Sequence, residues 1–411
     1  MTEGGPLGGV RVVELAMWVA GPGAAGIMAD WGADVVKVEA PSGDPARQFH
    51  RMLGGNADDV NPVFELDNRG KRSIAVDLTT APGRDVLERL LAEGDVFVTN
   101  LRPGALARLG LDPEEVVAAH PRLVYASITG YGLDGPDADR AAYDVGAYWS
   151  RAGIAEALRT PCGPQPFQRG GMGDHSVAKT GAAMVCAALL ERSRTGRGQV
   201  VSSSLLRQGA YTIGFDVNVA LMWGRTIMAG VRETMGSPTV NNYTAGDGRP
   251  FWFVGLQGER HWPALARAVG RPDWLTDERY ADARSRAANA RELNAELDVI
   301  FATRPLDEWA AVFAGEPELF WSPVNTIDDL LVDEQFYASG AVVGVPDDEG
   351  GRTMLATPAD FGGETPVPRG RAPRLGEHTL EVLGELGFAA PDVDALLAAG
   401  VAVADASPAG G

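Results

Sequence analysis

Short apolar runs alternate with amphipathic stretches through the first third of the chain. Runs rich in Val, Ile and Leu predict buried strands at residues 10–15, 34–39, 73–78, 95–100 and 123–129. Helical patterns separate several of these strands, at residues 24–31, 82–92 and 113–119. Thr80 followed by Pro82 is typical of a helix start. Strands that alternate with helices predict βαβ units, so we expect an α/β fold built on a parallel sheet.

The loops that follow these strands form the predicted binding edge, because ligands of parallel sheets bind beyond the carboxyl ends of the strands. In this chain the loops comprise residues 16–23, 79, 100–108 and 130–144.

A helix of small residues is predicted after Asp174. Apolar residues recur with the spacing of one buried helix face at Val177, Gly181, Val185 and Ala188, and Gly196 is a plausible helix end. Asp174 lies where an N-cap is expected, directly after Gly170, Gly171 and Gly173. An Asp at this position is commonly only a cap. The glycines also allow the main chain to approach a ligand, so the carboxylate could instead be a nucleophile with backbone N–H groups beside it.

The alternation of strands and helices ends near Phe215. An irregular stretch, a strand at 251–255 and helices at 262–269, 287–302 and 306–314 predict a smaller α+β domain. A strand near 341–345 and a helix at 375–387 follow. We therefore expect residues 1–224 to begin a large domain, 225–325 to form a small domain, and 326–411 to return to the large one.

One glycine motif suggests a different function. Gly21, Gly23 and Gly26 match the pattern G-x-G-x-x-G of dinucleotide-binding turns, and Glu39 could hold a ribose. Five residues separate the predicted strand from Gly21, however, whereas the first glycine of the fingerprint belongs at the strand end. We expect the glycines to permit a tight turn packed on the sheet, and an NAD(P)-binding oxidoreductase is the weaker alternative.

Charge and composition exclude several classes of partner. The formal net charge of −19 argues against binding to nucleic acid or to an anionic membrane surface. No apolar run approaches the roughly 20 residues of a membrane span. Cys162 and Cys186 are the only cysteines, which is too few for a disulfide framework and fits the reducing cytoplasm. No metal site is predicted.

Six ordered blocks of the sequence together carry a family resemblance. The chain resembles the class III CoA-transferases, which include formyl-CoA:oxalate and carnitine CoA-transferases and the related α-methylacyl-CoA racemases. The blocks are GVRVVELAMWVAGPGAAGIMADWGADVVKVE (9–39), GKRSIAVDL (70–78), NLRPGALARLGL (100–111), ITGYGLDGP (128–136), MGDHSVAKTGAAMVCAALLERSRTGRGQ (172–199) and LGEHTLEVLGELG (375–387).

The resemblance implies a fold and an activity. The fold is a Rossmann-like large domain formed by both ends of the chain, with the small domain between them and two chains interlocked as a homodimer. The activity is transfer of CoA from an acyl-CoA donor to a carboxylic acid acceptor, with the CoA thioester as substrate and no tightly bound cofactor. Asp174 falls at the position of the catalytic aspartate, which forms mixed anhydrides and an aspartyl-CoA thioester. An ordinary Asp is ionised at neutral pH, so this nucleophile needs no separate base.

The resemblance also implies which residues surround the substrates. Contacts to CoA carry over to Val19, Ala20, Val76, Asp77, Leu78, Thr79, Asn100, Leu101, Arg102 and Arg108. The two arginines suit nucleotide phosphates. Supporting residues are expected near the nucleophile, namely Tyr143, Asp144, Gly171, Gly173 and His175.

Three departures from the family pattern narrow the function. Val19 stands where the formyl-CoA enzyme has a Gln, and Ala40 and Thr79 replace basic residues that contact its nucleotide. We therefore do not expect formyl/oxalate specificity.

Racemases of the family use a His as base at a position that Tyr143 occupies here. A Tyr, with an ordinary pKa of about 10, is a poor base at neutral pH. A CoA-transferase is the prediction, a 2-methylacyl-CoA racemase is the main alternative, and a non-catalytic CoA-binding protein is a further one.

Overall fold

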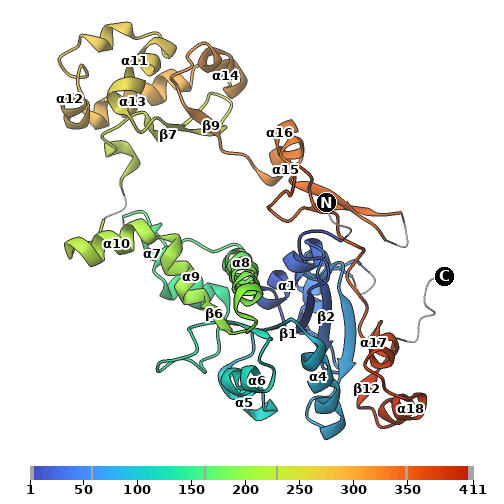
Figure 1. The fold of residues 1–411 in the computed structure, drawn as a ribbon. Helices are drawn as coiled ribbons and strands as arrows, with labels where there is room; N and C mark the ends of the chain where they lie inside the picture. The colour runs from blue at the N-terminus through green and yellow to red at the C-terminus, as the bar shows by residue number, and fades with distance from the viewer. Residues whose placement is uncertain (1–3, 57–58, 162, 228–229, 348–349, 406–411) are drawn as a thin grey trace. The chain divides into compact units, whose positions relative to one another are not determined.

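The computed structural model describes residues 4–56, 59–161, 163–227, 230–347 and 350–405. The chain folds into two compact units (Figure 1). The first unit comprises Met1–Ala157, Pro166–Thr226 and Tyr337–Gly411, and the second comprises Leu158–Gln165 and Ile227–Phe336.

A seven-stranded sheet organises the first unit. Its strands, in spatial order, are β12 (Ala402–Val403), β3 (Arg72–Val76), β2 (Asp34–Glu39), β1 (Arg11–Leu15), β4 (Val96–Thr99), β5 (Val124–Thr129) and β6 (Val200–Ser204). All neighbours are parallel except β12, which runs antiparallel to β3. The predicted α/β fold with a parallel sheet is confirmed. The order 3-2-1-4-5-6 is that of doubly wound dinucleotide-binding folds, and it reverses between β1 and β4.

Helices cover both faces of this sheet. One face packs on α1 (Ala20–Asp30) and α8 (Met172–Thr195) through alternate strand residues such as Val12 and Val35. The other face, with Val13 and Val36, packs on α4 (Ala81–Glu93), α5 (Pro103–Leu109), α6 (Pro113–Ala119), α17 (Thr379–Glu385) and α18 (Ala390–Ala398). Because side chains alternate between the faces of a strand, these continuous apolar runs are buried on both sides.

The glycine motif lies inside helix α1, so the prediction of a tight turn is wrong. A Cβ at Gly26 would lie 2.6 Å from the carbonyl oxygen of Asp67, and one at Gly23 would lie 3.2 Å from the Cβ of Ala178. The glycines therefore let α1 approach α3 (Pro62–Asn68) and α8 closely. This packing explains the motif without a dinucleotide.

The remaining elements of the first unit are mostly short. They are η1 (Pro45–Gln48), α2 (Phe49–Met52), the π-helix η2 (Val145–Arg151), α7 (Ile154–Ala157), α9 (Leu205–Thr212), α10 (Gly214–Trp223) and the hairpin of β10 (Val342–Val345) and β11 (Arg352–Leu355).

The second unit has its own sheet and core. Antiparallel strands β7 (Val240–Thr244), β8 (Pro250–Val254) and β9 (Trp321–Pro323) pack with helices around a cluster of aromatic side chains that includes Phe251, Phe253 and Phe301. The helices are η3 (Arg232–Thr234), α11 (Gly258–Ala268), η4 (Pro272–Leu275), α12 (Ala283–Ala288), α13 (Ala290–Phe301), α14 (Leu306–Ala314) and α15 (Ile327–Leu330), and α16 (Glu334–Ala338) follows at the junction with the first unit.

None of the helices in the described residues combines the length and the apolar composition that a membrane crossing requires.

Candidate active site at the start of helix α8

Asp174 lies in the first turn of α8 but does not cap it. The helix begins at Met172, and Gly171 is its N-cap with a left-handed φ of 75°. The prediction of Asp174 as the N-cap is therefore wrong: it is the third residue of the helix. The predicted helix end at Gly196 is confirmed. The apolar face that follows Asp174 is also confirmed, because Val177, Gly181, Val185 and Ala188 are buried. The small residues let α8 pack tightly against α1 and the sheet.

The Asp174 carboxylate is half-buried and makes no hydrogen bond with any residue that the structure describes. Burial raises its pKa to about 7, and the charges of Asp144 and Asp67 add to this rise, whereas His175 lowers it. The expectation of an ordinary, fully ionised carboxylate is therefore wrong. Perturbed groups of this kind concentrate at functional sites.

Asp144 fixes the chain on one side of the nucleophile candidate. Its Oδ2 accepts hydrogen bonds from the Gln168 side chain at 2.9 Å and from the Gly173 N–H at 3.3 Å. Its Oδ1 accepts from the Val145 N–H at 2.8 Å and caps η2. Asp144 thus ties η2, the glycine loop and the start of α8 together.

Gly173 is a glycine because the Tyr148 ring occupies the space of a side chain. A Cβ at position 173 would lie 2.6 Å from Cγ of Tyr148. By contrast, a Cβ at Gly170 would meet nothing within 4 Å. The glycine loop is therefore packed at Gly173 and open at Gly170.

His175 bonds to a carboxylate from another helix. Its Nε2 lies 3.1 Å from Oδ1 of Asp67, which α3 holds in a buried position. Hydrogen bonding to Asp67 raises the pKa of His175. This pair was not predicted from the sequence.

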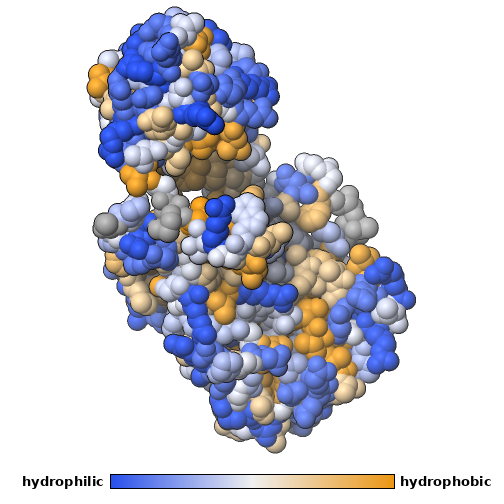
Figure 2. All heavy atoms as spheres, turned by 90° about the vertical axis from the view of Figure 1, so that its left-hand side faces the viewer, coloured by the Kyte–Doolittle hydropathy of each residue, from blue (hydrophilic) through white to orange (hydrophobic). Residues whose placement is uncertain are grey.

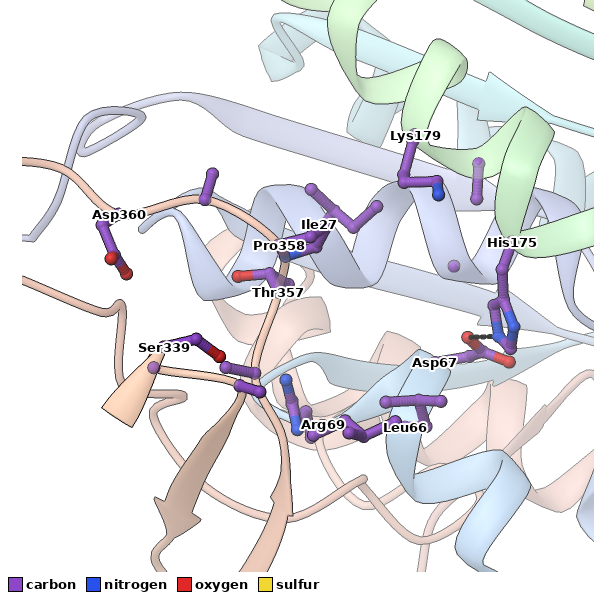
Figure 3. A pocket seen from close by; sticks show the side chains of 17 residues that line it. Ile27, Leu66, Asp67, Arg69, His175, Lys179, Ser339, Thr357, Pro358 and Asp360 are labelled. Atoms are coloured by element: carbon purple, nitrogen blue, oxygen red, sulfur yellow. Dashed lines mark hydrogen bonds and ion pairs between the residues drawn. The ribbon is translucent and has the colours of Figure 1, made fainter. Parts of the chain in front are cut away.

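A cavity of about 600 Å³ adjoins this pair (Figure 3). The Asp67–His175 pair lies at one end and Ser339 and Asp360 lie at the other, with Lys179 extending from α8. The volume falls in the range of small-molecule sites. The side wall is apolar along Ile27, Leu66 and Ala178.

The loops after β1 and β4 join at the point where the strand order reverses. The Asn100 side chain accepts from the Met17 N–H at 3.0 Å and donates to the Met17 carbonyl at 2.6 Å. In doubly wound sheets this switch point is where ligands bind. Two of the predicted CoA contacts, Val19 and Asn100, therefore lie at neighbouring loops of the expected edge.

Trp18 adds a residue that the sequence did not indicate. It has a φ of 66°, the sole positive φ among the non-glycine residues that the structure describes. Its N–H donates to Asp44, and its ring contacts Tyr143 edge-on with centroids 5.8 Å apart. A bulky residue held in this conformation stores strain, which is a feature of functional loops.

The other predicted CoA contacts divide into buried and exposed groups. Val76 and Leu78 are in the core beside β3, so their side chains are closed to a ligand, and Ala20 is buried in α1. Thr79, Arg102 and Arg108 are exposed, while Asp77, Asn100 and Leu101 are half-buried. One Arg102 N–H donates to the Asp139 carbonyl at 3.1 Å, and Arg108 lies in the last turn of α5.

The structure thus brings Asp144, Gly171, Gly173, Asp174 and His175 together at the start of α8. Tyr143 contacts Trp18 and Asn100 bonds to Met17, so both are connected to the loop after β1. No hydrogen bond or ion pair connects Thr79 or Arg108 to this group among the described residues.

Comparison with known proteins identifies the family of the chain, and the matches extend over nearly its whole length. The model of CoA-transferase family III matches residues 7–379. The (R)-2-hydroxy-4-methylpentanoate CoA-transferase of Clostridioides difficile is 32% identical over 388 residues, which cover 93% of this chain and 96% of that enzyme. The cinnamoyl-CoA:phenyllactate CoA-transferase of Clostridium sporogenes is 31% identical over 395 residues, covering 94% of this chain and 95% of that enzyme.

A solved structure extends the similarity to the fold. The crystal structure of a CAIB/BAIF family protein from Brucella suis superposes with a TM-score of 0.81 at 31% identity, covering 93% of this chain and 100% of that one. Matches of this length and similarity establish that the chain belongs to CoA-transferase family III, whose members act on CoA thioesters.

Proposed function

We propose that this chain transfers CoA from an acyl-CoA to a carboxylic acid through covalent intermediates on Asp174. The observation that carries the proposal is the Asp174 carboxylate itself. It stands in the first turn of α8 without a hydrogen-bond partner among the described residues, beside a glycine loop. A structural Asp at a helix start would instead bond to backbone N–H groups.

The chemistry follows from a carboxylate nucleophile. An Asp174 oxygen attacks the thioester carbonyl, and the C–S bond breaks. The CoA thiolate departs, and the acyl group stays on Asp174 as a mixed anhydride. The thiolate then attacks the aspartyl carbonyl, which releases the donor acid and leaves an aspartyl-CoA thioester. The acceptor carboxylate attacks this thioester to form a second anhydride, and the released thiolate attacks the acceptor carbonyl. The products are acceptor-CoA and the original Asp174 carboxylate.

Backbone N–H groups are suitable to stabilise the oxyanions of these steps. At the start of α8 the N–H groups of Met172 and Gly173 already donate to the Arg169 carbonyl and to Asp144, so the donors we propose are in the glycine loop before them. That loop, at Gly170 and Gly171, offers no side chain to obstruct an acyl group. One such donor is worth about 3 kcal/mol in a water-excluded site.

The acceptor class is proposed from the relatives. One relative is named for 2-hydroxy-4-methylpentanoate and another for phenyllactate, which are both 2-hydroxy acids. We therefore propose 2-hydroxy acids as the first candidates for the acceptor. A screen of acyl-CoA donors against 2-hydroxy acids, simple fatty acids and oxalate, read by mass spectrometry, identifies the pair.

Trapping of the covalent intermediate tests the mechanism. Hydroxylamine or borohydride added after the acyl-CoA should modify Asp174, identified by mass spectrometry of the peptide. Asp174→Asn should retain CoA binding, lose exchange and give no adduct. Exchange that continues in the wild type without any adduct would refute the proposal.

Three alternatives are distinguished by simple measurements. A racemase would incorporate deuterium at Cα of a 2-methylacyl-CoA without any acceptor acid. Tyr143 at the position of the base weighs against this activity, since its side chain is 65% exposed and contacts Trp18. A non-catalytic CoA-binding protein would be unaffected by Asp174→Ala. An oxidoreductase would bind NAD(P), against which the helical position of the glycine motif argues.

We further propose an interlocked homodimer that acts in the cytoplasm. Helix α10 has no buried residue among those described, and Phe215, Met222 and Trp223 are 90%, 79% and 64% exposed. Figure 2 views the molecule from the side that carries α10 in Figure 1 and shows apolar residues among polar ones. Such exposure is typical of an interface. Phe215→Asp should reduce the mass measured by light scattering from two chains to one. The division at residues 224 and 325 into a CoA-binding domain and a small domain stays a prediction.

A further inference from the structure

Asp67 is placed to act on the nucleophile candidate through His175. The Asp67 side chain projects from α3 and is 3% exposed, and its Oδ1 lies 3.1 Å from Nε2 of His175 (Figure 3). His175 directly follows Asp174 in the first turn of α8. The second carboxylate oxygen of Asp67 is buried and has no hydrogen-bond partner in the described part of the chain.

We propose that Asp67 is a positioning residue that keeps the His175 imidazole protonated and oriented beside the Asp174 carboxylate. The inference rests on the proposed function, in which Asp174 is the nucleophile. Asp67 itself touches no substrate in this scheme.

The hydrogen bond determines where the imidazole proton lies. A carboxylate only accepts hydrogen bonds, so the proton of the pair is on Nε2 of His175. A carboxylate beside a histidine also favours the charged imidazolium. The neighbouring N-terminus of α8 disfavours a cation, because the positive end of the helix dipole lies there. Asp67 supplies the negative charge that offsets this effect.

The charges around Asp174 make the imidazolium important. Asp144 faces it from the segment before η2 and Asp67 from α3, and both raise its pKa, while His175 is the neighbour that lowers it. The charge of Lys179, on the same helix, lowers the pKa of His175. Burial raises the pKa of Asp67 above its ordinary value, and the charge of Glu14 adds to this rise. The hydrogen bond and charge of His175 and the charge of Lys71 act in the opposite direction and favour the ionised carboxylate. Since the nucleophile must be ionised, loss of the imidazolium reduces the reactive fraction of Asp174.

A purely structural role for Asp67 is the competing explanation. The same bond joins α3 to α8, so its loss could simply loosen the packing. The two roles differ in one respect: a structural defect persists when His175 is absent, whereas a role through His175 disappears with it.

Histidine titration by NMR tests the proposal without any substrate. The chain has five histidines, and His175→Asn assigns the His175 signal in protein labelled at the imidazole carbons. The midpoint of His175 should lie above the ordinary value of about 6.5 in the wild type and fall by about one pH unit in Asp67→Asn. A midpoint that Asp67→Asn leaves unchanged would overturn the proposal.

A second His–carboxylate pair provides the matched control. Nε2 of His120, which directly follows α6, lies 3.1 Å from Oε1 of Glu88 on α4. Both helices pack on the face of the sheet opposite to α8. Glu88→Gln should leave the His175 midpoint where it is in the wild type. If Asp67→Asn does not fold, His175→Asn keeps the proposal testable: the titration of the Asp174 carboxyl, assigned with Asp174→Asn, should move to higher pH. An unmoved carboxyl midpoint would count against it.

Kinetics with the fastest donor and acceptor from the screen complete the test. Asp67→Asn should lower the rate of adduct formation at pH 7 several-fold, and the effect should largely vanish in the His175→Asn background. If Asp67→Asn lowers the rate equally in the wild-type and His175→Asn proteins, Asp67 has a structural role only. The proposed mechanism at Asp174 would be unaffected by that result. Absence of any adduct in the wild type would instead refute the proposed function, whatever the titrations show.

Discussion

The Tyr148 ring packs so closely on Gly173 that no other residue fits at this position. A Cβ there would approach three atoms of Tyr148 to between 2.6 and 2.8 Å. The Gly173 N–H also donates to Asp144, so this contact sets the distance between η2 and the residue before the nucleophile candidate.

Gly173→Ala should therefore displace the first turn of α8. Overpacking of this kind costs about 1–3 kcal/mol, so we expect a lower Tm and a loss of exchange activity greater than the loss of CoA binding. Gly384, on the exposed side of α17, meets nothing within 4 Å and provides the control. Gly384→Ala should raise the Tm slightly, because Ala restricts the unfolded chain. Thermal unfolding and exchange assays on both variants decide the matter.

The raised pKa of Asp174 predicts a stability that depends on pH. In the folded chain the pKa is about 7, against an ordinary value of 3.8, so the unfolded chain releases this proton at lower pH. The stability contributed by protonated Asp174 is present below pH 3.8 and is lost as the pH rises to about 7. Asp174→Asn cannot ionise, so its Tm should exceed that of the wild type by more at about pH 8 than at about pH 5.5.

An exposed aspartate tests whether this difference is specific. Asp392 lies on the surface of α18. The Tm difference between Asp392→Asn and the wild type should stay constant over the same pH range. If both variants behave alike, Asp174 is not the buried acid described above.

Arg108 is expected to bind the nucleotide phosphates of CoA. A charge-assisted contact of this type contributes about 1.5–3 kcal/mol, so Arg108→Ala should raise the KM for acyl-CoA about tenfold or more with little change in kcat. Arg122 is also exposed but precedes β5, at the opposite edge of the sheet, and its replacement should leave KM unchanged. Steady-state kinetics with varied acyl-CoA measures both, and an unchanged KM in Arg108→Ala would remove this residue from the binding site.

The Asn100–Met17 bridge should hold the loop that carries Val19. Asn100→Ala removes both hydrogen bonds, so we expect weaker CoA binding and a modest drop in Tm. Asn289 gives a matched control in the second unit, because its amide donates to the carbonyls of Arg279 and Ser285. Calorimetric titration with CoA should detect weaker binding for Asn100→Ala and wild-type binding for Asn289→Ala.

Much of the sheet could be predicted because its strands are continuous apolar runs. The predicted range 34–39 coincides with β2, and the predicted helices at 113–119 and 306–314 coincide with α6 and α14. By contrast, β6 ends in three serines and β12 has two residues, so neither has an apolar pattern to recognise. Helix α1 was placed four residues too late, because glycines and a proline are poor helix formers and only the packing on α3 and α8 explains them.

The parts of the site formed by neighbouring residues in the sequence could be predicted, whereas contacts between residues far apart in the sequence could not. Gly171, Gly173, Asp174 and His175 are consecutive or nearly so, and the glycine pattern indicated the loop. The partner of His175 is Asp67, 108 positions away, and no local pattern links the two. The raised pKa of Asp174 was equally hidden, since it depends on burial and on Asp144 from another segment. The positive φ of Trp18 was hidden for the same reason, since its backbone N–H donates to Asp44, 26 positions away.

The antiparallel strand β12 has a consequence for how the chain is made. Its pairing of Ala402 with Val76 covers one edge of β3, so that edge stays open during translation until residue 402 has left the ribosome. An unpaired edge strand readily joins with other chains. Nascent chains halted before residue 402 should therefore engage chaperones or aggregate more readily than chains halted after β12 has emerged.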